Sequence, residues 1–260
     1  MHAPNNKSRS TPTWALGRPQ RYGLLAAAAA LLCAAVGVYA YAGPLEPFSA
    51  TYRIEMAGLT IGTIDRSLAP GPGGRYRFLS ESGAKGLAKL LFDDHLIEES
   101  LFEANAAGLR PIRYSSRYTG HKGPSTVSVR FDWRRSKIKN KKNDRRWELP
   151  LSASVFDKLL YQLAIMYDLR AGKRDLSYRI LDGHEIKTYR FLDLGTERVK
   201  TPLGVFDSVK IERRKENSKR RTTIWCAPRL GYLAVRLDNR DGKGRDITAL
   251  IDRLTGIPVP

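Results

Sequence analysis

Histidine, cysteine and carboxylate side chains build most metal and catalytic sites, and this chain offers few of them at a useful spacing. Beyond residue 42 the histidines are His95, His121 and His184, and none lies at metal-ligand spacing from another. The densest polar cluster, residues 93–95, contains two Asp but a single imidazole. We therefore expect no metal, no cofactor and no catalytic residues, and we expect that the protein is not an enzyme.

Two further observations bear on catalysis. No Gly-x-Ser-x-Gly nucleophile motif occurs in the chain. Cys226 lies in the apolar stretch TTIWCAP, which is typical of a buried thiol rather than a reactive one. Carboxylates that are distant in the sequence can still converge in the fold, so an undetected envelope hydrolase is kept as an alternative.

Basic residues give the clearest chemical signal. The chain has 45 Lys and Arg against 26 Asp and Glu, a formal net charge of +19. Two short segments are far more basic than their surroundings, because residues 130–146 contain nine bases and two acids and residues 210–221 contain seven and two. Local charge of one sign attracts polyanions. The candidate anion-binding residues are Arg134, Arg135, Lys137, Lys139, Lys141, Lys142, Arg145, Arg146, Arg213, Arg214, Lys215, Lys219, Arg220 and Arg221.

The N-terminus indicates where such a polyanion would be met. Residues 1–21 carry four Lys or Arg and no acid, residues 22–45 are uncharged, and small residues occupy positions 40 and 42. This layout predicts a signal peptide over residues 1–42, export to the periplasm by the general secretory route, and a single domain over residues 43–260. An uncleaved inner-membrane anchor is the alternative.

The expected compartment selects among the polyanions. Trp133 and Trp147 flank the first basic segment, and stacking on aromatic rings in a basic groove is how single-stranded nucleic acid binds. An exported protein meets phospholipid head groups and lipopolysaccharide instead. We expect anionic lipid head groups or lipopolysaccharide as partners, and no nucleic acid.

Most of the chain has the alternation of β-strands. Residues 48–56 and 125–133 place apolar side chains at every second position, and Asp182-Gly183 is a favoured hairpin turn between two such runs. One helix is predicted over residues 154–172, with Ser154 and Asp157 as a capping box and Gly172 as its end, and a shorter one over 84–94. The predicted fold is mainly β, a curved antiparallel sheet forming a barrel or half-barrel with one or two helices packed on it.

This architecture leads to a functional hypothesis. We expect a non-catalytic envelope protein whose curved sheet holds an apolar or amphiphilic ligand and whose two basic hairpins dock on anionic surfaces. The expected lining residues of the ligand site are Tyr52, Ile54, Phe131, Trp133 and Leu163. The alternative is a structural module with a filled core that binds a soluble or cell-wall polyanion.

A family resemblance covers about residues 44–255. The segments that carry it are PFSATYRIEMAGLTIG, LRPIRYSSRY, RFDW, LPLSASVFDKLLYQLA, YRILDG, ERVKTPLGVFDSVKIE and TIWCAPRLGYLAVRL. They resemble DUF3108, a family of exported bacterial proteins of unknown function. The resemblance implies a periplasmic, mostly β protein similar in architecture to curved-sheet lipoprotein or lipid carriers, and it supplies no catalytic residues. The run after RFDW is richer in Lys and Arg than the family pattern.

Overall fold

The structure is a computed structural model of the chain. It consists mainly of strands in which apolar and polar side chains alternate. It describes residues 45–86, 93–105, 108–152, 154–214, 220–241 and 244–259, all within one compact unit. In the first strand Phe48, Ala50 and Tyr52 are buried whereas Ser49 is exposed. The predicted signal peptide over residues 1–42 lies outside the described residues.

The described residues form fifteen strands, one α-helix and two short 3₁₀ turns. They are β1 (Phe48–Met56), β2 (Leu59–Pro70), η1 (Pro72–Gly74), β3 (Tyr76–Ala84), β4 (His95–Asn105), β5 (Gly108–Thr119), β6 (Ser125–Asp132), β7 (Lys137–Lys142), β8 (Arg145–Pro150), β9 (Val155–Phe156), α1 (Tyr161–Arg170), β10 (Leu176–Asp182), β11 (Glu185–Thr201), β12 (Gly204–Arg214), β13 (Arg221–Ala227), η3 (Pro228–Leu230), β14 (Leu233–Arg240) and β15 (Asp246–Thr255).

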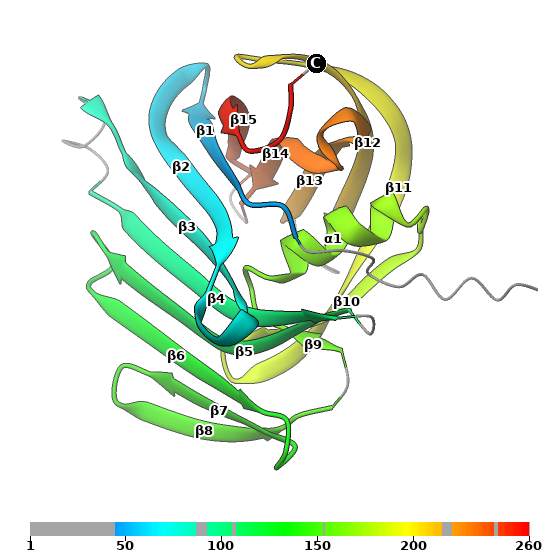
Figure 1. Cartoon of the computed structure of the whole chain (residues 1–260). Helices are drawn as coiled ribbons and strands as arrows, with labels where there is room; N and C mark the ends of the chain where they lie inside the picture. The colour runs from blue at the N-terminus through cyan, green and yellow to red at the C-terminus, as the bar shows by residue number, and fades with distance from the viewer. Residues whose placement is uncertain are drawn as a thin grey trace, which may run out of the picture. The chain divides into compact units, whose positions relative to one another are not determined.

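All fifteen strands belong to one sheet, which is strongly curved (Figure 1). Its order is β8-β7-β6-β5-β4-β3-β2-β1-β15-β14-β13-β12-β11-β10-β9, and every described pair except β9 with β10 is antiparallel. The predicted curved antiparallel sheet is therefore confirmed. The sheet does not close, because no backbone ladder joins its edge strands β8 and β9 among the residues that the structure describes.

Side chains link the two ends of the sheet where backbone pairing does not. The Asn140 side-chain amide of β7 donates to the Gly183 carbonyl at the β10–β11 turn, and the Trp147 ring of β8 stacks on His184 at 6.5 Å. Farther along, the Ser100 hydroxyl of β4 donates to Asp157 just after β9 (2.7 Å). These contacts hold the sheet in a nearly closed curve.

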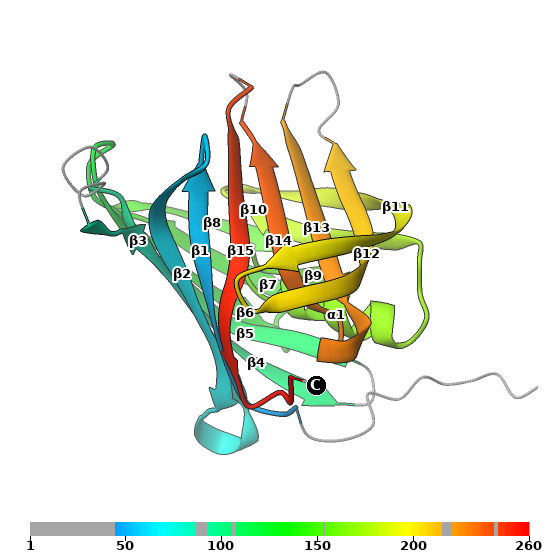
Figure 2. The same ribbon diagram turned by 90° about the horizontal axis from the view of Figure 1, so that it is seen from above.

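Helix α1 lies inside this curve, between β2–β8 on one side and β10–β13 on the other (Figures 1 and 2). Its buried side chains are Leu163, Ala164, Ile165 and Leu169, and they join the main hydrophobic core. Figure 2 shows α1 toward the end of the sheet where β13 ends and β14 begins. The helix therefore fills that end of the concave side.

The predicted beginning of this helix is wrong. Val155 and Phe156 pair with β10 as the short strand β9, and Ser154 has a φ of 62°, which no right-handed helical residue adopts. The Asp157 carboxylate accepts from the backbone N–H groups of Leu159 (2.9 Å) and Leu160 (2.7 Å), so it organises a turn that precedes α1. The shorter helix expected over 84–94 falls mostly on residues outside the described ones.

The β11–β12 hairpin bends across the outer side of the sheet (Figure 2). At its turn the Leu203 N–H donates to the Ile251 carbonyl of β15 (3.3 Å), and Val199 and Phe206 are buried. The hairpin thus covers part of the wall formed by β13, β14 and β15. The wall formed by β5–β8 has no such cover among the described residues.

Candidate functional site

The first basic segment forms part of an exposed face on the convex side of the sheet. As predicted from the sequence, it is a strand pair rather than a helix, because it forms β7 and β8. Along β7 the side chains of Lys137, Lys139 and Lys141 are exposed, whereas Ile138 and Asn140 between them are buried. Strict alternation therefore directs all three lysines to the same side, away from the core.

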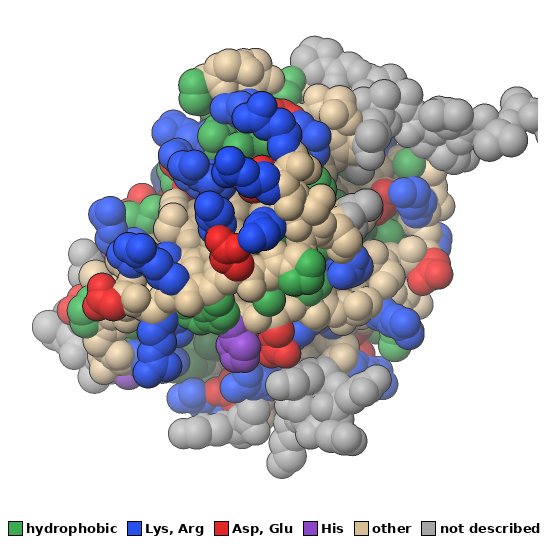
Figure 3. Space-filling view, turned by 90° about the horizontal axis from the view of Figure 1, so that it is seen from below, with side chains coloured by type: hydrophobic (Ala, Val, Ile, Leu, Met, Phe, Trp, Pro, Cys, Tyr) green, Lys and Arg blue, Asp and Glu red, His purple; other side chains and the backbone are tan. Residues whose placement is uncertain are grey.

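Cross-strand pairing extends this surface over four strands. Arg113 of β5 lies opposite Arg130 of β6, which lies opposite Lys139 of β7, and Lys141 lies opposite Arg146 of β8. We call this surface the basic face (Figure 3); it consists of Arg113, Arg117, Arg130, Lys137, Lys139, Lys141 and Arg146, all exposed. Like charges directly opposite each other in an antiparallel pair are destabilising, so this arrangement carries a cost to folding.

Few acids balance the basic face. Glu148 contacts Lys137 (3.0 Å) and Lys139 (4.0 Å), and the hydrogen bond from Lys137 lowers the pKa of Glu148. Glu99 contacts Arg113 at 3.4 Å. Within the described part of the chain, no ion pair is formed by the remaining four: Arg117, Arg130, Lys141 and Arg146. The face therefore keeps a positive charge that can attract anions.

The other residues predicted in the first segment lie at its two turns. Arg134 and Arg135 follow β6, and the Arg135 guanidinium lies 3.7 Å from Asp132. Lys142 and Arg145 face each other at the β7–β8 turn, on the side of the sheet opposite Lys141 and Arg146. Sequence reasoning missed Arg113 and Arg117; their signal was the alternation of Arg with apolar residues in LRPIRYSSRY.

The second basic segment has a different environment. Glu212 is only 4% exposed and contacts both Arg214 and Arg221 (3.4 Å for Arg221). Arg213 instead lies over the Tyr189 ring at 3.9 Å. Arg220 is also described, and Lys215 and Lys219 lie outside the described residues. Arg213, Arg214 and Arg221 thus contact an acid or a ring, unlike the four cations of the basic face that form no ion pair in the described part of the chain.

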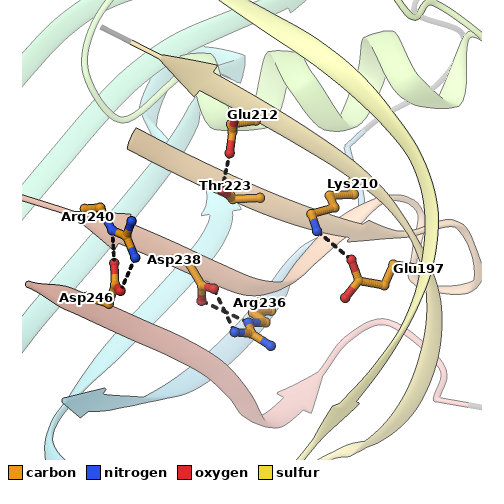
Figure 4. Close-up of polar contacts among 8 residues, drawn as sticks. All are labelled: Glu197, Lys210, Glu212, Thr223, Arg236, Asp238, Arg240 and Asp246. Atoms are coloured by element: carbon orange, nitrogen blue, oxygen red, sulfur yellow. Dashed lines mark hydrogen bonds and ion pairs between the residues drawn. The ribbon is translucent and has the colours of Figure 1, made fainter. Parts of the chain in front are cut away.

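Balanced charge continues along the wall of which this hairpin is part (Figure 4). Arg236 contacts Asp238 at 2.7 Å, Arg240 contacts Asp246 at 2.6 Å, and Lys210 contacts Glu197 at 2.7 Å. The same contacts lower the pKa of Glu197, chiefly through Lys210, and of Asp246, chiefly through Arg240. These three cations are therefore each paired with an acid, in contrast to the four cations of the basic face that form no ion pair within the described residues.

The predicted lining residues are not gathered at one site. Tyr52, Phe131 and Leu163 are buried in the core, Trp133 is partly buried, and its indole donates to the Pro111 carbonyl (2.7 Å). Leu163 lies on α1 and lines a cavity, and Tyr52 contacts Arg66, which lines the same cavity. Phe131 and Trp133 lie in and after β6, on another part of the sheet.

This cavity is small. Its volume is about 20 Å³, and its lining includes Phe48, Arg66, Phe78, Leu163 and Leu237. A cavity of roughly 10–15 Å³ holds one water molecule, whereas pockets for drug-sized ligands measure roughly 300–1,000 Å³. The end of the concavity occupied by α1 is therefore filled by protein.

Beyond the helix, the inner side of the sheet is less enclosed. Ile54 and Ile64 continue the inward-facing series that contains Tyr52, and Leu96 and Leu237 lie at corresponding levels of β4 and β14. All four side chains are only partly buried. An apolar band thus remains partly exposed on the inner side, and its Leu237 also lines the small cavity beside α1.

The residues considered for catalysis have structural partners. Asp94 accepts hydrogen bonds from Tyr118 and from His121 (2.7 Å), which lower the pKa of Asp94 against the effect of burial, and His95 contacts Glu81 at 2.8 Å. Burial raises the pKa of Cys226 to about 12, so its thiol is protonated. In the described residues no three His, Cys, Asp or Glu side chains are grouped to hold a metal ion.

No helix in the described part of the chain is long and apolar enough to cross a membrane.

Comparison with solved structures gives one match with a TM-score above 0.5 and two further matches with lower scores. A beta-barrel-like protein of the domain of unknown function DUF1849 from Brucella abortus matches with a TM-score of 0.53 at 10% identity, covering 83% of this chain and 99% of that one. A candidate lipoprotein from Parabacteroides distasonis matches at a TM-score of 0.31 and 14% identity, covering 81% and 96%. A candidate exported protein with a YmcC-like fold from Bacteroides fragilis matches at 0.34 and 12%, covering 81% and 96%.

Comparison at the level of sequence gives a family but no function. No curated protein matches the chain. A family model described as "Protein of unknown function (DUF3108)" matches residues 50–252. That span runs from within β1 to within β15 and contains the helix α1 and the whole basic face. The chain therefore belongs to the DUF3108 family.

Proposed function

We propose that this protein is a non-catalytic, exported protein of the bacterial envelope that docks on an anionic surface through its basic face. One observation carries the proposal: Arg113, Arg130 and Lys139 lie side by side on three strands, and Lys141 opposes Arg146, with few acids nearby. Such pairs reduce stability, whereas mixed charges would not. Binding of an anion would account for the presence of these like-charge pairs, which folding alone disfavours.

Membrane lipid is the partner that this geometry fits best. Neighbouring strands lie about 4.8 Å apart, so the basic face presents a two-dimensional array of cations on a convex surface rather than a groove for a single strand of polymer. Each Lys or Arg close to an anionic membrane contributes about 1 kcal/mol to binding. Four cations without acid partners are thus enough to localise the protein on phosphate-bearing head groups, including those of lipopolysaccharide.

Carriage of an amphiphile is a second candidate function. The end of the concavity that α1 fills leaves no room for a lipid, but the apolar band of Ile54, Ile64, Leu96 and Leu237 is partly exposed on the inner side. Exposed apolar surface on a concave wall favours an alkyl chain as its ligand. Docking and carriage together would describe a protein that exchanges an amphiphile with a membrane.

Vesicle sedimentation tests the docking proposal and separates it from its alternative. Vesicles of neutral lipid are compared with vesicles containing one-third anionic lipid, in 50, 150 and 500 mM salt. We expect binding to the anionic vesicles only, decreasing as salt rises. Equal binding to both kinds of vesicle contradicts the proposal. Tight binding to a soluble polyphosphate together with no binding to anionic vesicles would favour the soluble polyanion instead.

A further inference from the structure

Arg66 places a charge on the inner side of the sheet without an acid to balance it. Its guanidinium lies 5.2 Å from the Tyr52 ring centre, and it lines the cavity of about 20 Å³ together with Leu163 of α1. The Nε–H of Arg66 is buried and donates to no acceptor of the described residues, and Arg66 forms no ion pair with them. A buried donor of this kind is costly unless an acceptor reaches it.

A belt of polar side chains surrounds Arg66 on the inner wall. Register places Arg66, Ser80, Glu98 and Ser116 at one level on four consecutive strands, β2 to β5. Glu98 accepts a hydrogen bond from the Tyr114 hydroxyl (2.6 Å) and forms no ion pair with Arg66. Arg66 is therefore left to a partner other than the carboxylate in its own belt.

A second arginine approaches the same region from the opposite wall. Arg213 of β12 lies over the Tyr189 ring at 3.9 Å, and that ring packs edge-on against Tyr161 of α1, with centroids 5.9 Å apart. Arg213 forms no ion pair within the described residues. Burial raises the pKa of Tyr161 to about 12, and the charges of Arg213 and Arg66 oppose this rise, so both guanidinium groups act on the same hydroxyl.

The surroundings of these two arginines divide into polar and apolar parts. On one side lies the small cavity beside Arg66, whose volume is sufficient for a single oxygen atom of a ligand or one water. Next to it lies the apolar band of Ile54, Ile64, Leu96 and Leu237, of which Leu237 also lines the cavity. A ligand that satisfies both parts has an anionic head and one alkyl chain.

We propose that Arg66 and Arg213 bind the anionic head group of a single-chain amphiphile, a carboxylate or a phosphate monoester. One head-group oxygen accepts the Nε–H of Arg66, the Tyr161 hydroxyl donates to another, and the chain lies along the apolar band. This inference rests on the carriage part of the proposed function and names its ligand class. It is independent of the basic face, which lies on the convex side.

Isothermal titration with three ligands of the same chain length tests the proposal. Dodecanoate, dodecyl phosphate and the neutral dodecanol are compared at concentrations below micelle formation, on the wild type and on R66M, R66K and R213M. R190M removes an exposed arginine of β11 as a matched control. Circular dichroism and thermal unfolding confirm that each variant is folded.

The expected result is a preference of the wild type for an anionic head of at least tenfold over dodecanol. R66M abolishes this preference, R213M weakens it, R66K retains part of it, and R190M leaves it unchanged. The stronger of the two anionic ligands identifies the head group as carboxylate or phosphate.

Three outcomes would overturn the inference. Equal binding of all three ligands leaves carriage standing and removes the anionic head site, with Arg66 Nε hydrated by water only. An unchanged preference in R66M assigns the anion to another surface. No binding of any ligand to the wild type removes carriage and the head site together, while docking by the basic face is unaffected.

Discussion

Asp157 shows how one buried side chain connects the helix to the sheet. It is 1% exposed and accepts hydrogen bonds from Ser100 and from the backbone N–H groups of Leu159 and Leu160. The charge of Glu98 raises the pKa of Asp157, and the charge of Asp157 raises the pKa of Tyr114. Burial raises the pKa of Asp157 from 3.8 to about 6, and its hydrogen bonds only partly offset this rise. The carboxyl group is therefore more readily protonated in the folded chain than in the unfolded one.

This shift predicts a dependence of stability on pH. Because the folded state binds the proton more tightly, the contribution of Asp157 is most favourable below pH 4 and is lost as pH rises through about 6. Its full size is on the order of 3 kcal/mol. The D157N variant lacks this contribution. We therefore expect the unfolding free energy of the wild type to fall relative to that of D157N as pH rises from 4 to 7.

Urea unfolding at pH 4, 5, 6 and 7 measures that difference. The other carboxylates contribute equally to the wild type and to D157N, so their contributions cancel in the difference. Parallel curves for the two proteins across this range would show that Asp157 has an ordinary pKa. The role of Asp157 as the link between β4 and α1 could not be found from the sequence, because the spacing of Ser154 and Asp157 is equally typical of a capping box.

Elements of this fold differ in how well the sequence predicts them. Strands such as β1 and β6 follow from alternation, and the β10–β11 hairpin follows from Asp182-Gly183, because these signals are local. The position of α1 inside the sheet, the parallel β9–β10 pair and the fold-over of the β11–β12 hairpin depend on contacts between residues far apart in the chain. Local patterns contain no information on those contacts.

The candidate site divides in the same way. The lysines of β7 were predicted as candidate anion-binding residues, because the density of basic residues over 130–146 is visible in the sequence. The pairing of Arg113 with Arg130 was not, because it depends on the register between β5 and β6. The sequence gives no sign that the two basic segments differ, because the contacts of Glu212 with Arg214 and Arg221 depend on the pairing of β12 with β13.

Helix α1 is expected to stabilise the protein by filling the concave side. Leu163 is 1% exposed and lines the small cavity, so L163A enlarges a space that the sheet cannot fully collapse into. We expect a loss of about 2–5 kcal/mol in the free energy of unfolding. R170A, at an exposed position of the same helix, is the matched control and should cost less than about 0.5 kcal/mol. A cost for L163A as small as that of R170A would mean that α1 is not packed in the sheet.

At the scale of the whole molecule, the proposed export would determine which partners the protein meets. We predict that expression in a bacterial host with an outer membrane yields a periplasmic protein that begins at Gly43, because cleavage after Ala42 follows the small residues at positions 40 and 42. Intact mass measurement of the periplasmic fraction checks this. Recovery of the full-length chain in the inner-membrane fraction would support the uncleaved anchor.

The two walls of the sheet differ in how their cations are paired. One wall forms local ion pairs such as Arg236 with Asp238, whereas the wall of β5–β8 directs cations outward with few acids between them. Net positive charge alone would attract any polyanion weakly. The account requires more, namely that the cations of the basic face contribute far more to binding than an equal number of exposed cations elsewhere.

Binding of two charge-matched variants to the same anionic vesicles tests this most directly. R117Q/R130Q/K141Q/R146Q removes four cations from the basic face, and R190Q/R198Q/K200Q/R229Q removes four exposed cations of β11 and η3. At 100 mM salt we predict that the first variant loses at least tenfold in vesicle affinity, since each cation contributes about 1 kcal/mol, and that the second loses less than threefold. Equal losses in the two variants would contradict the assignment of docking to the basic face.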